Sequence, residues 1–456
     1  MGRWQALSRR LGFQFDYIAI ALRLAIPNCA DIPRSHARVR PLGHHYANQS
    51  RLKMVIWRKK MGDGSSSEQR TLWLLITALT VGGAEQTLVE LANNVDRDTY
   101  DVTIWTIFDT NPLESDLRKD VTVKSLTDAG KVENGYVVAA SNPLAYISAP
   151  LRFWYAAAVN RPDIIHSFIL FDNFLAGVAG LVCPATVITG VRNVPNDRST
   201  ARTLLERATL RLPDLIVSNS KAGVEFAVEL GADPDRVTIV PNGRDVEQFH
   251  TASPDAVYSE LDIGDDQLVV GTVGRLKERK GHFELLTAWA DVQRRTPNAR
   301  LLLVGEGEEH DALRAHAAEL GCRDSVEFLG HRRDIPELLA AMDIFAFPSH
   351  YEGLPGAVIE AMAAGCPIVA TPVDGTKDLL DGYRNGLFVP VEAPDELGWA
   401  ISRLIQTPEL RATLGEAAQA EASAEYTIET MVARFESLYE ASHDSQGSAV
   451  PKVRKQ

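Results

Sequence analysis

Short runs of Val, Ile, Leu and Phe recur from Thr71 to Ala370 and are separated by stretches long enough for a helix. Continuous apolar runs of this length are typical of strands that are buried on both faces of a parallel sheet. Because parallel strands need crossover connections, usually helices, the alternation predicts an α/β fold. The expected strands are residues 72–77, 102–107, 164–168, 186–189, 215–218, 268–273, 301–304, 326–329, 344–347 and 368–370.

The series of strands is interrupted once, by the turn-rich Pro241-Asn242-Gly243 and the segment that follows it to Asp266. We interpret this segment as a linker, since 456 residues exceed one domain of ordinary size. The sequence therefore predicts two doubly wound, Rossmann-like domains, residues 69–245 and 246–425. They are expected to face each other across a cleft lined by the carboxyl ends of their strands.

Both ends of the chain differ from this body. Residues 1–61 carry 12 Lys and Arg but only 2 Asp and Glu, whereas the rest of the chain carries 35 against 58. We interpret residues 1–68 as a disordered extension or as upstream sequence read from an early start codon; a basic segment at a membrane surface is the alternative. An amphipathic helix within residues 426–442 is expected to return toward the first domain, and residues 443–456 are expected to be a disordered tail.

The charge and cysteine content narrow the class of protein. An acidic main body makes nucleic acid an unfavourable partner. No uninterrupted apolar run reaches the length of about 18 residues that a membrane-spanning helix needs. The cysteines are scattered, without a Cys-x-x-Cys pair or a histidine at ligand spacing, which indicates reduced thiols in a cytoplasmic protein and no structural zinc site. They are Cys29, Cys183, Cys322 and Cys366.

Two glutamates stand eight positions apart across a glycine-rich junction between a strand and a helix. Pro355 suits the first turn of that helix, so Glu352 is expected on the loop and Glu360 about a turn and a half inside the helix. The rise from Pro355 to Glu360 is roughly 7.5 Å, comparable with a sugar joined to a ribose through phosphates. A helix start also favours an anionic ligand. A solvated helix with ordinary acidic residues is the alternative.

Two further junctions could reach the same anion. Gly82 and Gly83 follow a strand and open a helix, where a glycine backbone can approach a phosphate closely; a plain tight turn is the alternative. Residues 274–281 follow the strand that ends at Val273. There Arg275 and Lys280 could neutralise a diphosphate without a metal ion, unless the segment is only a solvated charged loop.

Six motifs in order resemble those of the retaining glycosyltransferases of family four, which have the two-domain GT-B fold. The resemblance covers roughly residues 70–440. It implies a metal-independent hexosyltransferase without a cofactor, which uses a nucleotide-diphosphate sugar, most often UDP-linked. The implied acceptor is a glycan, a lipid-linked intermediate or a polysaccharide at the cytoplasmic face of the membrane, with possible peripheral contact to it. The motifs are Gly82-Gly83-Ala84-Glu85, Pro241-Asn242-Gly243, residues 273–281, residues 304–307, residues 328–330 and Glu352-x7-Glu360.

The resemblance also implies residue roles. Arg275 and Lys280 would hold the donor diphosphate and stabilise the charge that develops on the leaving phosphate. Glu352 would bind the hydroxyls of the donor sugar, and Glu360 those of the ribose. His166 would reach the transferred sugar from the first domain. The remaining donor contacts would come from Gly82, Gly83, Glu306, Gly307, His331, Gly353, Leu354 and Pro355.

The implied reaction is attack on the face from which the phosphate leaves, with the departing phosphate taking the acceptor proton. Glu352 is then a binding residue and not a nucleophile, unlike the carboxylate of a retaining glycosidase. Two departures from the family pattern concern the substrates. Residues 374–378 lack the usual Gly-Gly followed by a glutamate, which bears on the donor sugar, and Phe168 stands where a His-x-His pair would place its second histidine.

Four other classes of protein share part of this pattern. A metal-dependent transferase needs an Asp-x-Asp at a strand end, but residues 96–98 and 233–235, which have that spelling, fall in turn-like stretches before strands. A dinucleotide-dependent oxidoreductase needs Gly-x-Gly-x-x-Gly, and residues 305–310 lack the third glycine. A nucleotide-sugar epimerase of the same fold and a non-catalytic sugar-nucleotide-binding protein stay open as alternatives.

Overall fold

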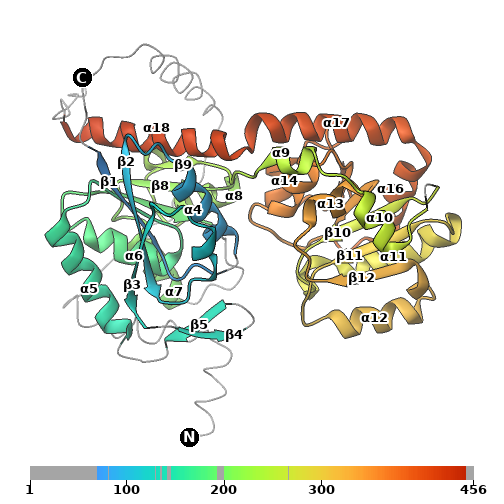
Figure 1. Ribbon diagram of the computed structural model, residues 1–456, viewed down its shortest axis with the longest axis horizontal. Helices are drawn as coiled ribbons and strands as arrows, with labels where there is room; N and C mark the ends of the chain where they lie inside the picture. The colour runs from blue at the N-terminus through green and yellow to red at the C-terminus, as the bar shows by residue number, and fades with distance from the viewer. Residues whose placement is uncertain are drawn as a thin grey trace, which may run out of the picture.

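The computed structural model describes residues 69–80, 82–128, 130–133, 136–140, 145–192, 200–264 and 266–447 (Figure 1). The expectations for residues 1–68 lie outside these ranges, as does the expected tail beyond Gly447. Two separate parallel sheets form the body, each covered by helices, so the α/β prediction with two Rossmann-like domains is confirmed.

The first domain is built on a seven-stranded parallel sheet of order β3-β2-β1-β6-β7-β8-β9. Its strands are β1 (Arg70–Ile76), β2 (Tyr100–Phe108), β3 (Thr122–Thr127), β6 (Ile164–Ser167), β7 (Thr186–Val191), β8 (Leu215–Ser218) and β9 (Val237–Ile239). Its helices are α4 (Gly83–Asn94), α5 (Ala145–Asn160), α6 (Leu170–Ala179), α7 (Thr200–Thr209) and α8 (Lys221–Glu229), with short 3₁₀ turns η2 (Pro112–Asp116) and η3 (Pro234–Arg236). A small antiparallel hairpin pairs β4 (Gly130–Glu133) with β5 (Tyr136–Ala140).

Alternate residues of the central strand β1 serve two cores. Leu72 and Leu74 pack toward α4 and α18 (Ile428–Gly447), whereas Trp73 and Leu75 pack toward α5 and α6. A strand covered on both faces in this way has no polar face, which is why it was readable from sequence as a continuous apolar run.

The second domain has a six-stranded parallel sheet of order β12-β11-β10-β13-β14-β15. Its strands are β10 (Val269–Val273), β11 (Arg300–Val304), β12 (Val326–Gly330), β13 (Ile344–Phe347), β14 (Ile368–Ala370) and β15 (Leu387–Phe388). Its helices are α9 (Val246–His250), α10 (Asp255–Leu261), α11 (His282–Arg295), α12 (His310–Glu319), α13 (Ile335–Ala340), α14 (Gly356–Ala363), α15 (Asp374–Leu379), α16 (Pro394–Gln406) and α17 (Pro408–Glu425), with 3₁₀ turns η4 (Glu278–Lys280) and η5 (Arg323–Ser325).

All ten expected strands are present, with ends that differ by at most two residues. The strands that the sequence missed lie at sheet edges or in the hairpin. β3 reads Thr-Val-Lys-Ser-Leu-Thr and is largely exposed, and β9 and β15 have three and two residues. Edge strands are one-sided and short, so they lack the apolar run by which the central strands were found.

Two expectations were wrong in detail. The segment after Gly243 is not a free linker, because Phe249 of α9, Val257 of α10 and Ile263 just after α10 are buried in the core of the second domain. The closing helix does not end at residue 442, because α18 continues to Gly447. Short amphipathic helices with one or two buried residues carry too weak a period to be read from sequence.

The chain crosses between the domains at two adjacent places. These places are Gly243 and Thr427, and they touch: a Cβ on Gly243 would stand 2.7 Å from the Thr427 carbonyl oxygen. Beyond that point α18 packs Met431, Phe435 and Tyr439 into the core of the first domain. Figure 1 shows α17 and α18, in red, following one another along one side of both domains. In the described ranges no helix is both long and apolar enough to cross a membrane.

Candidate functional site

The topology of the second sheet creates a crevice at one point of its carboxyl edge. The chain runs from β10 outward to β11 and β12, and then returns to place β13 on the other side of β10. Ligands of open α/β sheets bind where the strand order reverses in this way, because the two connections leave in opposite directions. The connections here are residues 274–281 after β10 and residues 348–355 after β13, the segments that carry Lys280 and Glu352.

Lys280 and Glu352, separated by 72 residues in the sequence, form the shortest charged contact of this crevice. The Lys280 Nζ lies 2.6 Å from the Glu352 Oε1, and the two side chains are 14% and 10% exposed. The Arg279 Nη1 lies 3.8 Å from the other carboxylate oxygen, and the Lys280 ammonium stands 5.3 Å from the centre of the Phe347 ring. A largely buried cation is therefore held in place at the point where the strand order reverses.

The two connections also touch through their backbones. The His350 N–H donates to the Arg279 carbonyl oxygen over 2.8 Å. Gly281 has a φ of +70°, and a Cβ there would stand 2.1 Å from the Pro348 carbonyl oxygen. No residue with a side chain fits this position, so the approach of the two loops depends on glycine.

Glu360 lies inside α14, as expected, and Pro355 is the residue that precedes the helix. The sequence did not single out its partner, Arg244, whose Nε lies 2.9 Å from the Glu360 Oε1. These side chains are 13% and 20% exposed. The only signal for Arg244 was its position directly after the Pro-Asn-Gly motif, and the contact spans the crossing between the domains.

The loops after β10, β11 and β12 are hydrogen-bonded to one another. The Leu276 N–H donates to the Glu306 carbonyl oxygen over 2.9 Å, and the His331 N–H lies 3.4 Å from the Glu306 Oε1. A Cβ on Gly307 would stand 2.1 Å from the Leu276 carbonyl oxygen. The fold thus brings Glu306, Gly307 and His331 together beside the segment that begins with Arg275.

The departure at residues 374–378 has a structural use. Gly375 lies so close to Gly353 that a Cβ would stand 1.5 Å from the Gly353 carbonyl oxygen, with Pro355 also in contact. The loop that carries Gly353, Leu354 and Pro355 is therefore braced by the start of α15. The same helix carries Asp378, which accepts a hydrogen bond of 2.7 Å from the Lys221 N–H.

This last contact joins the two domains at their carboxyl edges. Lys221 begins α8 just after β8, and Asp378 lies in α15 after β14. The Lys221 Nζ is also 3.3 Å from the Asp378 Oδ1. Because both residues follow the carboxyl ends of strands, the two edges face each other, as the GT-B arrangement requires.

Gly82 and Gly83 lie where the strand order of the first sheet reverses, between β1 and β6. Gly83 is the first residue of α4, and Gly82 precedes it without a side-chain cap. Glu85 folds back toward Gly82, and burial raises the pKa of its carboxyl group. The predicted role of this turn in approaching a phosphate stays a prediction.

His166 does not join the other predicted residues. It is fully buried, and its Nδ1 lies 2.8 Å from the Tyr439 hydroxyl of α18, with the Phe168 ring stacked at 4.4 Å. Burial first, and then the charge of Arg192, hold its pKa well below the usual value. The ring of His166 is therefore not accessible in the structure, and its predicted role stays a prediction.

The aspartate pairs that could suggest a metal site stabilise turns instead. Asp96 accepts from the Asp98 N–H at 3.0 Å and from the Thr99 hydroxyl, and Asp233 accepts from the Asp235 N–H at 3.1 Å. Over the described ranges, no three His, Cys, Asp or Glu side chains are grouped as metal ligands would be. Cys183, Cys322 and Cys366 are buried free thiols.

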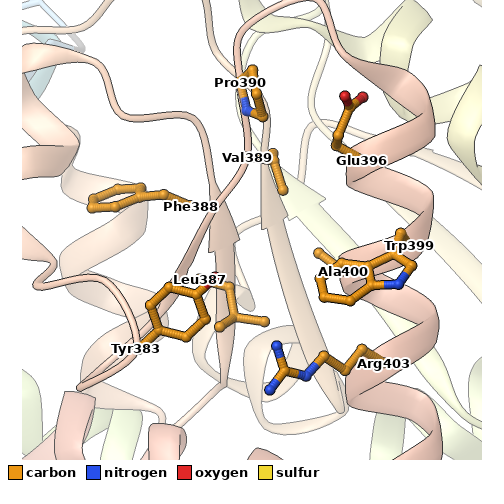
Figure 2. Close-up of a pocket in the computed structure, with 9 residues that line it drawn as sticks. All are labelled: Tyr383, Leu387, Phe388, Val389, Pro390, Glu396, Trp399, Ala400 and Arg403. Atoms are coloured by element: carbon orange, nitrogen blue, oxygen red, sulfur yellow. The ribbon is translucent and has the colours of Figure 1, made fainter.

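A separate hollow of about 130 Å³ lies on the far edge of the second sheet (Figure 2). It is bounded by β15 and by Trp399 and Arg403 of α16, with Tyr383 at its rim. None of the predicted site residues lines it, so we do not connect it with the crevice. On the first domain, α5 exposes four apolar side chains at four-residue spacing: Ile147, Leu151, Tyr155 and Val159. The membrane contact that the family resemblance implies stays a prediction.

Two family models match the chain in succession. The model of Glycosyltransferase Family 4 matches residues 81–248, and the model of Glycosyl transferases group 1 matches residues 258–421. The D-inositol 3-phosphate glycosyltransferase of Stackebrandtia nassauensis is 33% identical over 300 residues, 60% of this chain and 67% of that protein. That of Segniliparus rotundus is 30% identical over 59% of this chain and 66% of its own length, slightly less than two thirds.

Solved structures share the fold. The HepE protein of Anabaena, crystallised with UDP, superposes with a TM-score of 0.70 at 23% identity, over 82% of this chain and 100% of that one. The sucrose-phosphate synthase of Thermosynechococcus elongatus superposes with a TM-score of 0.69 at 19% identity, over 83% of this chain and 100% of that one. The two family models and the relative at 33% identity show that this chain belongs to the glycosyltransferases of family 4, and the solved structures show the GT-B architecture.

Proposed function

We propose that this protein transfers a hexose from a nucleotide-diphosphate sugar, with UDP as the carrier, to a glycan or lipid-linked acceptor, without a metal ion and with retention of anomeric configuration. The observation that carries the proposal is the contact of Lys280 with Glu352 at the point where the second sheet reverses its strand order. The HepE structures with UDP and with UDP-glucose support the choice of carrier by analogy of fold.

The charge of Lys280 matches the main demand of this reaction. When the bond between the anomeric carbon and the diphosphate breaks, negative charge develops on the leaving phosphate oxygens. Lys280 and Arg275 would oppose that charge, the ammonium as a point charge and the guanidinium through its fork. In the structure, Glu352 pairs with Lys280 at 2.6 Å. With donor bound, the phosphate would take over that partnership and leave Glu352 to accept hydrogen bonds from the sugar hydroxyls.

The bond changes balance without a further reactant. The acceptor hydroxyl oxygen forms a bond to the anomeric carbon on the face from which the diphosphate departs, and the hydroxyl proton passes to a leaving phosphate oxygen. Glu352 acts as a binding group in this scheme. Glu360 would accept hydrogen bonds from the ribose, with Arg244 as a positioning residue that holds its carboxylate at 2.9 Å.

The remaining donor contacts extend this assignment. We assign Glu306 and Gly307 of the loop after β11 and His331 of the loop after β12 to the nucleobase end, as the family resemblance implies; the two loops are joined at the contact of the His331 N–H with the Glu306 Oε1. The backbone of Gly353, Leu354 and Pro355 would face the sugar, and that of Gly82 and Gly83 would approach the diphosphate from the first domain. His166 would act from the first domain only if its buried ring became accessible.

The test is a transfer assay with a panel of nucleotide sugars in EDTA. We expect one UDP-sugar to be consumed with release of UDP, and an α-linked donor to give an α-linked product by NMR. An inverted product would contradict the retaining mechanism, and loss of activity in EDTA would contradict metal independence. Conversion of the donor sugar without any acceptor would favour an epimerase, and donor binding with no turnover across the acceptor panel would favour a binding protein.

A further inference from the structure

The hollow of Figure 2 lies between the edge strand β15 and α16, and its volume is about 130 Å³. β15 ends the strand order of the second sheet, so within the described ranges no strand pairs with its outer side. The floor of the hollow is apolar, because Leu387, Val389 and Ala400 are buried there. Figure 2 shows Tyr383 on the β15 side of the hollow and Trp399 on the α16 side.

Trp399 is exposed, unlike the other tryptophans that the structure describes. Its exposed fraction is 58%, whereas Trp73, Trp105 and Trp289 are buried and Trp154 is half-buried. An indole left in water forgoes a large gain from burial, so its exposure calls for a reason. The guanidinium carbon of Arg403, one turn further along α16, stands 5.4 Å from the centre of the Trp399 ring. This contact restricts the orientation of the exposed ring.

Tyr383 is presented to the hollow by a strained and well-anchored turn. It is 72% exposed, and its φ of +70° lies in the left-handed region, which is unfavourable for a bulky residue. The Tyr383 N–H donates to the Gly386 carbonyl oxygen over 2.8 Å. The fully buried Asn385 amide donates to the Leu379 carbonyl oxygen over 3.2 Å and to a Glu421 carboxylate oxygen over 2.7 Å. Strain that a fold retains around an exposed side chain is a reason to look for a function.

Two charged side chains bound the hollow at its ends. Glu396, Trp399 and Arg403 follow one another at spacings of three and four residues, so they share one face of α16. Within the described ranges, the side chains of Glu396 and Arg403 form no ion pair and no hydrogen bond. Figure 2 shows them at opposite ends of the hollow. The hollow therefore offers a hydrogen-bond acceptor at one end and a donor at the other.

The size and chemistry of the hollow narrow the class of ligand. Its volume is below the roughly 300–1,000 Å³ of pockets for drug-sized ligands, and a stable protein partner would cover about 800 Å² per side. An anionic ligand would be attracted by Arg403 but repelled by Glu396. A sugar ring meets both demands, because its C–H faces are apolar and stack on aromatic rings, while its hydroxyls pair with a carboxylate and a guanidinium. The hollow therefore suits one pyranose ring.

We propose that this hollow is a second carbohydrate-binding site, which holds one pyranose unit of a neutral glycan by stacking on Tyr383 and Trp399. No residue assigned to the donor lines it. β15 lies two strand spacings, about 10 Å, beyond the β13 strand that bounds the donor crevice, so a glycan of several units could reach both places. The binding itself needs no donor and no bond change. Only its use for holding an acceptor or a product rests on the proposed function.

The test is affinity electrophoresis of the full chain in native gels that contain a neutral polysaccharide, which is dextran, galactomannan or hydroxyethylcellulose. We expect at least one polymer to retard the chain, and the dependence of mobility on polymer concentration gives a dissociation constant. Trp399→Ala and Tyr383→Ala should each raise that constant by about 10-fold or more, the scale of losing one stacked ring. The affinity of both variants for UDP, measured by calorimetry, should equal that of the wild type.

Two further variants separate binding from a structural role. Tyr383→Gly removes the ring and also relieves the left-handed backbone, so the retardation should be lost while the urea midpoint of unfolding does not fall. Tyr155→Ala removes a tyrosine of α5 that is 73% exposed, and it should leave the retardation unchanged.

Three outcomes would overturn the inference. They are the absence of retardation by any of the polymers, equal retardation of Trp399→Ala and the wild type, and a dimer that separates in Trp399→Ala, which would assign the hollow to a second copy of the chain. Glycan binding by a wild type that binds no UDP would instead refute the proposed function and leave this site in place.

Discussion

The two sheets have the same kind of reversal in strand order, but their carboxyl edges handle charge differently. In the second domain Lys280 pairs with Glu352 at 2.6 Å, and Glu360 pairs with Arg244 at 2.9 Å. In the first domain Arg192 has only an amide oxygen as acceptor, and His166 is buried against a tyrosine hydroxyl. The comparison shows that charged side chains are paired with each other at the edge of the second sheet, whereas Arg192 and His166 at the edge of the first sheet have only neutral partners.

The largest expected effect tests the paired edge. Lys280→Ala and Glu352→Ala should each fold and lower kcat by about 100-fold or more, the scale of losing one charge-stabilising contact in a transition state. The measurement is the initial rate of UDP release with the accepted donor. Lys277→Ala is the matched control, because Lys277 lies in the same loop with its side chain 36% exposed and 3.9 Å from Glu308. Near-normal rates for both active-site variants would remove the proposed roles.

A second effect concerns how the paired edge is held together. Gly281→Ala should lower the free energy of unfolding by about 2 kcal/mol or more, since a left-handed backbone alone costs roughly 1–2 kcal/mol and the new Cβ also meets the Pro348 carbonyl. Gly321→Ala separates the two causes, because Gly321 has a φ of +73° with open space around it. Urea unfolding of both variants measures the difference. Equal losses would show that the loop yields to the Cβ.

A third effect tests Arg244 as a positioning residue. Arg244→Ala should raise the donor KM by about tenfold with a smaller change in kcat, because one charge-assisted hydrogen bond to Glu360 contributes roughly 1.5 kcal/mol. Arg244→Lys should recover part of the loss. Arg384→Ala breaks an exposed pair with Glu421, 3.0 Å long, and should leave the KM unchanged. A fall in kcat alone would place Arg244 in the chemical step instead.

The smallest effect belongs to the first domain. His166 is buried with its pKa far below the usual value, so the unfolded chain binds a proton that the folded chain refuses. Stability from this site is therefore complete above the unfolded pKa of about 6.5 and is lost as the pH falls below it. His166→Phe should make the fall in stability between pH 7 and pH 5.5 shallower by roughly 1 kcal/mol. His282→Phe serves as the comparison, because burial lowers the pKa of His282 to about 4. An unchanged slope for His166→Phe would show that the ring accepts protons in the fold.

Much of the second domain could be predicted from sequence. Its strands β13 and β14 were placed to the residue, because central strands of a parallel sheet are continuous apolar runs. Glu352 and Glu360 stood out because a proline and a glycine mark the helix between them. The ion pairs could not be predicted, since no local pattern links Lys280 to Glu352 or Arg244 to Glu360, which lies 116 residues away.

The first domain was less readable at the level of single side chains. Its strands were found, but His166 was expected to be accessible and Arg192 was not singled out. Both outcomes depend on distant segments. α18 returns from the end of the chain to cover His166 with Tyr439, and the crossing between the domains brings Asn242 to Arg192. A residue at a strand end faces a ligand or a core according to what packs on it.

The sequence by itself determined the two-domain α/β architecture, the strands that build it and the glycine positions at which loops meet. It did so because strand burial, turn chemistry and backbone freedom are local properties of short segments. Only the tertiary structure decided which charges are paired and which buried cation lacks an acid. Pairing and burial arise from contacts between segments far apart in the chain, and their energies depend on how much water those contacts exclude.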